Sequence, residues 1–282
     1  MAIPKLQDYD LPNMNNIPPN KVNWEFEPDK AVLLIHDMQY YFVNFWGKNS
    51  PMLAKVIDNI NILRQFSRLH GIPIYYTAQP KNQSHEERAL LNDIWGAGLV
   101  NFPEQQPIIE ALSPHIDDII LPKWRYSAFQ RSLLEQQMRE GHRNQLIIVG
   151  IYAHIGCMVT AIDAFMHDIK PFFVADAMAD FSRDEHLMSL NYIAGRAGCV
   201  LMTKDLLQTA ISKEALRTQV LSLLDDSDIP LDDENLIDYG LDSIQIMSLA
   251  SNWRKTYQHI DFISLAKEPS INAWWSLLSQ KM

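Results

Sequence analysis

The chain has 282 residues, of which 47% are hydrophobic, and it carries a formal net charge of −10. This length allows two domains of ordinary size with a sizeable core. The negative charge argues against nucleic acid as a partner, and no apolar stretch is long enough to span a membrane. Two cysteines make no disulfide framework, and the polar, Pro-rich first 28 residues lack the apolar core of a signal peptide. We therefore expect a cytoplasmic protein with reduced thiols.

Apolar runs alternate with segments of helical spacing over the first 200 residues. The apolar runs predict strands at 31–35, 72–76, 116–121, 146–149, 171–175 and 199–202. The helical spacing predicts helices at 51–70, 131–141, 156–168 and from Arg183, with a long loop at about 80–107. Strands interleaved with helices are typical of the α/β class, so we expect a doubly wound parallel sheet with helices on both faces.

In such a sheet the ligand crevice lies beyond the carboxyl ends of the strands. The residues that follow the predicted strands are Asp37, Gln79, Lys123, the segment 151–156 and Asp176. We expect these residues to meet at one edge of the sheet.

The last 70 residues differ in composition from the first part. Residues 211–282 contain 11 acids and 6 bases, so this short segment carries half of the net charge. We expect a first domain over residues 1–208, a short linker over residues 209–212 and a second domain over residues 213–282. Apolar spacing predicts a small four-helix bundle there, with helices at about 213–224, 243–257, 262–267 and 271–279.

The sequence Tyr-Gly-Leu-Asp-Ser-Ile at 239–244 follows a segment rich in acids. No Lys or Arg occurs from 225 to 242. One interpretation is a plain helix start, with Asp242 or Ser243 as the N-cap. The other is a modification site, because a helix N-terminus favours an attached phosphate and flanking acids suit docking to a basic enzyme.

This motif resembles the attachment site of carrier proteins, in which phosphopantetheine is esterified to the serine. The resemblance implies 4′-phosphopantetheine on Ser243 and a phosphopantetheinyl transferase as a partner. Mg²⁺ could bind through Asp225, Gly240 and Asp242 while the transferase is docked; a solvated acidic surface is the alternative. The helix residues Ile246, Met247 and Ala250 are candidates for partner docking or for bundle core.

The first part resembles the isochorismatase-like hydrolases. The resemblance rests on His-Asp-Met-Gln at 36–39, Lys-Trp-Arg-Tyr-Ser-Ala-Phe at 123–129 and Gly-Ile-Tyr-Ala-His-Ile-Gly-Cys at 150–157. The wider superfamily uses an Asp, a Lys and a Cys, and the first two match Asp37 and Lys123. The nucleophile position falls on Gly156, with Cys157 one residue later, and isochorismatases proper lack the cysteine.

Together the two parts resemble the bifunctional isochorismatase–aryl carrier proteins of catecholate siderophore synthesis, of the enterobactin and vibriobactin type. The resemblance implies hydrolysis of isochorismate to 2,3-dihydro-2,3-dihydroxybenzoate and pyruvate, and carriage of 2,3-dihydroxybenzoate. The implied partners are an aryl-adenylating ligase and the condensation domain of a nonribosomal peptide synthetase. Many relatives self-associate, so a homo-oligomer is expected.

Vinyl ether hydrolysis needs a proton donor and no nucleophile on the enzyme. Asp37 is the candidate acid, which requires a pKa raised by burial and by the anionic substrate. Lys123 is expected to bind substrate and orient Asp37, and Gly156 to leave room where a thiolate would have been. The resemblance implies further substrate contacts at Gln79, Arg88 and Tyr152. The aromatic side chains Phe42 and Trp95 are candidates either for excluding water from the site or for plain core or lid packing.

Several alternatives stay open at this point. Arg88 is either a grip for a substrate carboxylate or an ordinary surface residue. His36 and His154 are expected to be structural, because they lack a third partner at metal-ligand spacing. The chain could also be an amidase-type cysteine hydrolase that uses Cys157, or a carrier scaffold with an inactive first domain.

Overall fold

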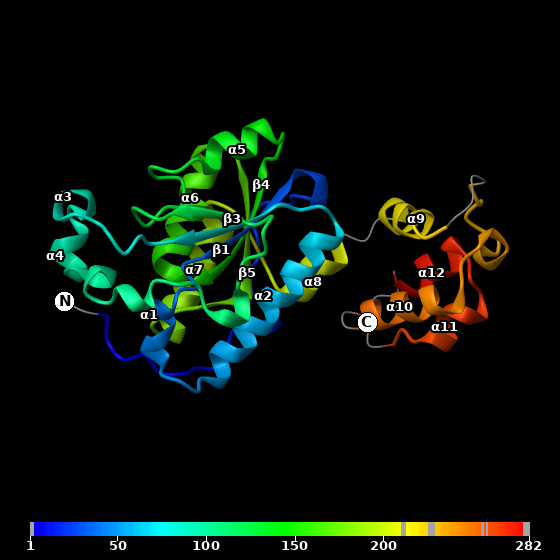
Figure 1. The fold of residues 1–282 in the computed structure, drawn as a ribbon, viewed down its shortest axis with the longest axis horizontal. Helices are drawn as coiled ribbons and strands as arrows, with labels where there is room; N and C mark the ends of the chain where they lie inside the picture. Colours follow the sequence, from blue (N-terminus) through cyan, green and yellow to red (C-terminus); the bar gives the residue numbers. More distant parts are fainter. Residues whose placement is uncertain (1–2, 210–212, 225–228, 255–256, 258, 279–282) are drawn as a thin grey trace. The chain divides into compact units, whose positions relative to one another are not determined.

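The structure is a computed structural model that describes residues 3–209, 213–224, 229–254, 257 and 259–278. The chain divides into two compact units, Met1–Thr203 and Lys204–Met282, which are shown in Figure 1.

The first unit is built on one six-stranded sheet. Its strands are β1 Ala31–His36, β2 Ile74–Ala78, β3 Ile119–Pro122, β4 Gln145–Ile151, β5 Lys170–Ala179 and β6 Cys199–Leu201. They are ordered β3-β2-β1-β4-β5-β6, and every neighbouring pair is parallel. The predicted doubly wound parallel sheet is confirmed. The strand order reverses between β1 and β4, which is where such sheets bind their ligands.

Helices cover both faces of this sheet (Figure 1). The long helix α2 (Pro51–Leu69) packs against β1, β4 and β5 on one face. On the other face, α5 (Leu134–Glu140), α6 (Met158–Met166) and α7 (Arg183–Arg196) share a buried cluster with alternate residues of β1, including Val32 and Leu34. The central strands are apolar on both faces, because both faces are covered.

Short helices fill the region that the sequence predicts as a long loop. Between about 80 and 107 these are α3 His85–Arg88 and α4 Leu91–Trp95, with 3₁₀ turns at Gly98–Asn101 and Pro103–Gln105. Elsewhere in the first unit lie the short helix α1 Tyr40–Val43 and 3₁₀ turns at Met14–Asn16, Pro28–Lys30, Asn44–Trp46 and Glu110–Leu112. In α3, Ser84 and Glu87 form a capping box that lets a single helical turn stand alone in this segment.

Several strand boundaries differ from the prediction, and the largest differences are at the start of β3 and the end of β5. β3 begins at Ile119 because His115 and Asp118 hydrogen-bond to one another in a turn, which leaves Ile116 exposed. β5 continues to Ala179, so Asp176 lies within the strand instead of following it. The Asp176 carboxylate accepts hydrogen bonds from the backbone and hydroxyl of Thr203, and the residue after the strand is Asp180.

The helix predicted at 156–168 is split. A π-helical turn, Ala153–Cys157, comes first, and α6 begins at Met158. The backbone N–H of His154 donates to Asp180 Oδ2 (2.6 Å), so a side chain from the end of β5 holds the start of this turn. Amphipathic spacing alone does not distinguish a π turn from an α turn.

Helix α8 (Thr203–Thr209) lies where the sequence predicts the joint between the domains. Its last residue, Thr209, is the first of the predicted linker, and residues 210–212 lie outside the described part of the chain. The domain limits 1–208 and 213–282 stay a prediction.

The second unit contains the predicted four-helix bundle. Its helices are α9 Lys213–Leu221, α10 Ser243–Arg254, α11 Phe262–Lys267 and α12 Ile271–Leu278, and a 3₁₀ turn covers Leu236–Tyr239. The four helices pack around the fully buried Trp274, whose indole N–H donates to the carbonyl of Leu265 (2.9 Å). Among the residues that the structure describes, no helix has the length and apolar character needed to cross a membrane.

Candidate active site and carrier serine

A pocket that is open to solvent lies at the carboxyl ends of the central strands. All eight residues that the sequence predicts for catalysis and substrate binding line it: Asp37, Phe42, Gln79, Arg88, Trp95, Lys123, Tyr152 and Gly156. They come from segments that follow β1, β2, β3 and β4, because parallel strands bring their carboxyl ends to the same edge. A pocket lined mostly by apolar and aromatic side chains, with a few charged groups among them, suits a small carboxylated molecule.

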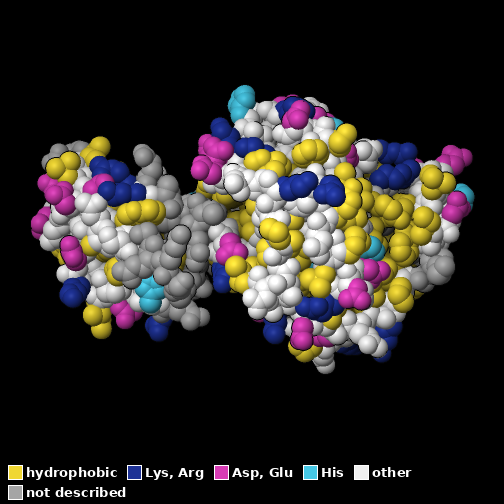
Figure 2. Space-filling model, turned by 180° about the vertical axis from the view of Figure 1, so that it is seen from behind, with side chains coloured by type: hydrophobic (Ala, Val, Ile, Leu, Met, Phe, Trp, Pro, Cys, Tyr) yellow, Lys and Arg dark blue, Asp and Glu magenta, His cyan; other side chains and the backbone are white. Residues whose placement is uncertain are grey.

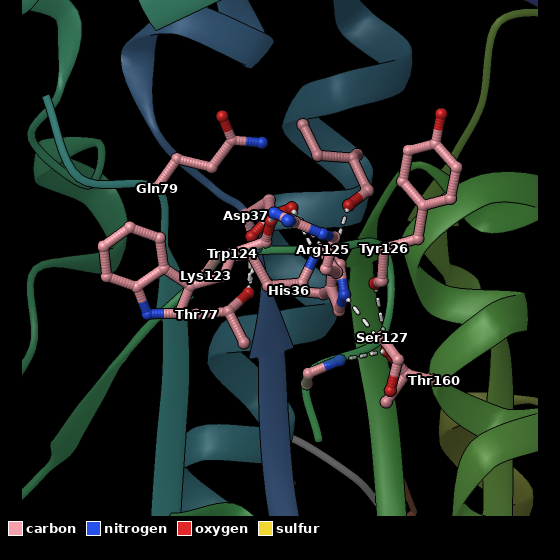
Figure 3. A network of polar contacts seen from close by, with 12 residues as sticks. His36, Asp37, Thr77, Gln79, Lys123, Trp124, Arg125, Tyr126, Ser127 and Thr160 are labelled. Carbon is pink, nitrogen blue, oxygen red and sulfur yellow. Dashed lines mark hydrogen bonds and ion pairs between the residues drawn. The ribbon is translucent and has the colours of Figure 1, made fainter. Parts of the chain in front are cut away.

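Asp37 is held from three sides (Figure 3). The Thr77 hydroxyl donates to Oδ1 (2.5 Å), the Lys123 ammonium lies 3.2 Å from Oδ2, and His36 Nδ1 lies 3.4 Å from the same oxygen. The residue has a φ of 50°, and its backbone N–H donates to the Thr77 hydroxyl oxygen (3.0 Å). The carboxylate is therefore fixed in one orientation at the base of the pocket.

Burial by itself raises the pKa of Asp37, but Lys123, His36 and the hydrogen bond from Thr77 outweigh burial. The pKa of Asp37 consequently lies below its ordinary value. The sequence analysis expects a pKa raised by burial together with the anionic substrate, and burial alone does not produce that rise. The physical reason is that a buried ammonium stands directly beside the carboxylate.

Arg88 is buried, with 4% of its surface exposed, so the alternative of an ordinary surface residue is wrong. Its Nε donates to the carbonyl of Gly96 (2.6 Å) and its Nη1 to Oε1 of Gln83 (3.2 Å). No carboxylate of the described residues forms an ion pair with it. A side chain at Gly98 would overlap the guanidinium, since a Cβ there would lie 2.4 Å from Nη2. The arginine is thus a buried cation, fixed in place and available to an anionic ligand.

Gln83 joins the two cationic parts of the pocket. Its side-chain amide donates to the backbone carbonyl of Lys123 (3.3 Å) while its carbonyl accepts from Arg88. The sequence analysis does not single out Gln83, because a glutamine in an irregular segment has no pattern that distinguishes it.

Aromatic side chains form the walls. The Tyr152 hydroxyl donates to the carbonyl of Phe42 (2.9 Å), and the Trp95 indole donates to the Tyr126 hydroxyl (2.8 Å). The Phe181 ring lies 4.6 Å from the Tyr152 ring. The pocket also has lining residues that the sequence does not predict: Ile3, Tyr41, Leu91, Arg125, Tyr126, Ile155 and Phe181. Of these, Arg125, Tyr126 and Ile155 lie in segments that the resemblance quotes.

His154 has acidic neighbours that the sequence analysis does not foresee. Its Nδ1 lies 2.5 Å from Asp180 Oδ1, and its Nε2 lies 3.8 Å from Glu185 Oε1. Among the described residues these three form the one cluster of histidine and acids at metal-ligand spacing. Asp180 already accepts from the backbone of His154 and from the backbone of Phe181, so the cluster is explained as an anchor of the π-helical turn.

Cys157 is completely buried in the apolar cluster beneath α6 and α7. Burial raises the pKa of its thiol well above the ordinary value, so the thiolate required for a nucleophile is disfavoured. The geometry therefore counts against the cysteine-hydrolase alternative.

We expect Cys157→Ala to keep most of the activity that the resemblance implies, the hydrolysis of isochorismate. The substitution removes one buried sulfur atom and should cost about 1 kcal/mol of stability, because it leaves a small cavity. Steady-state assays and thermal melts on the purified variant check this. Loss of all activity in a variant that still melts cooperatively would contradict it, as would a covalent intermediate on this thiol in the wild type.

Ser243 is the first residue of α10 and is exposed. The residue before it is the N-cap, since Asp242 Oδ1 accepts from the backbone of Gln245 (2.7 Å) and the Gln245 side chain accepts from the backbone of Asp242 (2.8 Å). The plain helix start and the modification site are therefore compatible. The capped turn presents the serine at the helix N-terminus, open to solvent.

Two other predictions for this region fare differently. Ile246 and Ala250 are buried in the core of the bundle, so the prediction that they contact a partner is wrong. Met247 and its neighbour Ile244 are 57% and 77% exposed, so Met247 stays a candidate for partner docking. Of the three predicted metal ligands, Asp225 lies outside the described residues. Nothing in the described geometry supports Mg²⁺, because Asp242 uses Oδ1 to cap the helix.

Comparisons with known proteins agree with this geometry. Residues 31–205 match the family described as the isochorismatase domain, and residues 214–276 match the phosphopantetheine attachment site. Enterobactin synthase component B of Escherichia coli (strain K12) is 64% identical over the full length of both chains. An isochorismatase of Bacillus subtilis (strain 168) is 44% identical over all of this chain and 96% of its own.

A solved structure shares the fold of the first unit. It is a cysteine hydrolase from Pseudomonas syringae pv. phaseolicola 1448A, with a TM-score of 0.61 and 23% identity, covering 68% of this chain and 97% of that one.

Proposed function

The chain belongs to the isochorismatase family and carries a phosphopantetheine attachment domain, and from this membership we propose how its two parts work. It is an isochorismatase and an aryl carrier protein. The first unit hydrolyses the vinyl ether of isochorismate to 2,3-dihydro-2,3-dihydroxybenzoate and pyruvate. The second carries 2,3-dihydroxybenzoate as a thioester in nonribosomal siderophore synthesis, as the full-length likeness to an enterobactin synthase component supports.

In the proposed reaction, Asp37 gives its proton to the terminal methylene carbon of the enolpyruvyl group. The vinyl π electrons form the new C–H bond, and positive charge develops on the carbon that bears the ether oxygen. Water adds to that carbon and loses a proton. The resulting hemiketal loses its hydroxyl proton to form the ketone of pyruvate, while the bond to the ether oxygen breaks and that oxygen takes up a proton, so pyruvate and the dihydrodiol leave. No covalent bond to the enzyme is formed.

Asp37 must be protonated to act in this way, although the pocket without substrate favours its ionised form. Isochorismate carries two carboxylates. Their negative charge next to Asp37 raises the pKa of this side chain and competes for Lys123. We propose that Asp37 takes up its proton as the dianionic substrate enters. The ammonium of Lys123 then interacts with a substrate carboxylate as well as with Asp37, which weakens its stabilisation of the Asp37 carboxylate.

Arg88 is proposed to grip one substrate carboxylate with its Nη atoms, since its Nε is occupied by the carbonyl of Gly96. Gln79 and the backbone around Gly156 supply further polar contacts, and the apolar wall of Phe42, Trp95 and Tyr152 limits the access of water. Removal of water strengthens each of these charge interactions.

On the second unit, Ser243 is proposed to receive phosphopantetheine from coenzyme A through a phosphopantetheinyl transferase. An aryl-adenylating ligase then loads the arm, and a condensation domain accepts the acyl group. We do not assign Mg²⁺ to the loop alone; a cation would join only with the transferase and the phosphates of coenzyme A.

We also propose that the chain forms homo-oligomers through its first unit. Exposed hydrophobic side chains support this, as Figure 2 shows for one face. Leu90, Ile94 and Met166 are exposed beside a wide apolar groove next to the pocket. The cytoplasm is the proposed location.

The observation that carries the enzymatic proposal is the buried Asp37–Lys123 pair at the base of a pocket that also holds a buried Arg88. The test is release of pyruvate when the purified chain is incubated with isochorismate, measured with lactate dehydrogenase and NADH. A chain that releases none would favour the alternative of a carrier scaffold with an inactive first domain.

We expect the two parts to function separately. Every residue proposed for hydrolysis lies between positions 37 and 156, and the second unit has its own buried core around Trp274. A fragment of residues 1–208 keeps the Asp176–Thr203 cap of α8 and should hydrolyse isochorismate at the rate of the whole chain. Residues 212–282 alone should accept phosphopantetheine. Failure of either folded fragment would indicate a site shared between the domains.

A further inference from the structure

His36 fills the space beside Gly156. A Cβ atom built on Gly156 would lie 2.1 Å from His36 Cε1 and 2.9 Å from both ring nitrogens. His36 is completely buried, and Gly156 is also buried at the wall of the pocket. The sequence analysis expects Gly156 to leave an open space, and that expectation is wrong, because the imidazole occupies it.

The imidazole is held in place by both of its nitrogens. Nδ1 lies 3.0 Å from the carbonyl of Ile151, which can only accept, so Nδ1 carries a proton. Nε2, which then carries no proton, lies 3.3 Å from the Thr160 hydroxyl and accepts from it, while the hydroxyl oxygen accepts from the backbone N–H of Ala128 (3.0 Å). The ring therefore cannot move away from position 156 without breaking hydrogen bonds to β4 and α6.

The same ring faces the proposed proton donor. Nδ1 lies 3.4 Å from Asp37 Oδ2, the oxygen that also meets Lys123. Burial, followed by the charge of Lys123, lowers the pKa of His36 to about 4, so the ring is neutral near pH 7. The neutral ring packs against the carboxylate and limits its movement without adding a second full charge that would hold its proton away.

We propose that His36 is a positioning residue whose imidazole takes the volume of a side chain at position 156 and fixes Asp37 for proton donation. His36 and Gly156 are then a matched pair: the large side chain of His36, at the end of β1, leaves no space for a side chain at position 156, which follows β4. No group, nucleophilic or otherwise, can stand at position 156 beside Asp37 while His36 is in place. This inference rests on the proposed function of Asp37.

The test is a double-mutant cycle with Gly156→Ala, His36→Asn and the two combined. Asparagine keeps an N–H donor for the carbonyl of Ile151 and lacks the ring atoms that lie nearest to position 156. The melting temperature, kcat and KM for isochorismate are measured for each variant of the full chain. Gly195→Ala is the control, because nothing lies within 4 Å of a Cβ at that position in α7.

Gly156→Ala should melt at a lower temperature and lose activity, whereas Gly195→Ala should match the wild type in activity. The double variant should melt at a higher temperature than Gly156→Ala alone, although it carries one more change. His36→Asn should lower kcat by about tenfold or more with little change in KM, because misplacing Asp37 affects the proton transfer more than substrate binding. A role in stability alone would leave kcat of the folded variant unchanged.

If the change in melting temperature of the double variant equals the sum of the changes in the two single variants, the proposal of a matched pair is wrong. It is also wrong if Gly156→Ala melts and reacts as the wild type does. An unchanged kcat in folded His36→Asn would overturn the positioning role. If His36→Asn does not fold, His36→Val takes its place in the cycle with the same criteria. Asp37→Asn is assayed in parallel: retained turnover there overturns the proposed function itself, whereas an inactive Asp37→Asn together with an additive cycle overturns only this inference.

Discussion

Asp37→Asn lowers pyruvate release from isochorismate by about 10²–10⁴-fold, the range typical of removing a general acid. The amide has nearly the same shape, so it can still accept from the Thr77 hydroxyl, but it has no proton to give to carbon. The loss should appear in kcat measured at saturating isochorismate. A coupled assay of pyruvate, with circular dichroism to confirm the fold, checks this result.

The substitution also leaves Lys123 without its buried partner, which costs stability. Thermal melts of the variant are therefore needed beside the assay. The matched control is Asp118→Asn, which removes a carboxylate paired with Arg68 (3.0 Å) outside the pocket and should keep wild-type turnover. Near wild-type activity in Asp37→Asn would show that another group supplies the proton.

Ser243→Ala abolishes loading of the carrier unit. Phosphopantetheine is esterified to a hydroxyl, and alanine has none, so no residual modification is expected. The intact mass is measured after incubation with a phosphopantetheinyl transferase, coenzyme A, an aryl-adenylating ligase, ATP and 2,3-dihydroxybenzoate. Wild type should gain two successive masses, the arm and then the aryl acid, and the variant should gain neither.

Ser248 offers a matched control, because it is also exposed on α10 but lies more than one turn from the helix start. Ser248→Ala should load as wild type does. Modification that persists in Ser243→Ala, or a wild type that is never modified, would contradict the assignment of the carrier serine. Hydrolysis of isochorismate should be the same in all three proteins.

The sequence predicts the sheet well because its strands are short apolar runs that end in polar residues. The run 31–35 is followed by Asp37 and the run 72–76 by Gln79, and both polar residues line the pocket. A parallel strand buried on both faces is apolar throughout, so its position in the folded sheet can be predicted from the local sequence pattern alone.

The features that were missed depend on contacts between distant segments. The clash between position 156 and His36 joins residues 120 apart in the chain, and no spacing rule reports it. The extent of β5 was underestimated because Met178 and Ala179 pair with β4 after an irregularity in the register. The sign of the Asp37 pKa shift depends on the distance to Lys123, which only the folded sheet sets.

The position of β3 has a consequence for folding and inactivation. Asp37 and Lys123 are 86 residues apart, and they meet only after β2 has paired with β1 and β3 with β2. β3 has four residues and lies at one edge of the sheet, where local opening requires less free energy than in the central strands. We therefore expect recovery of activity to be a late event in refolding, because it depends on pairing between distant segments of the chain. On heating, we expect opening of this edge to separate the two charges, so that enzymatic inactivation precedes the loss of the central strands.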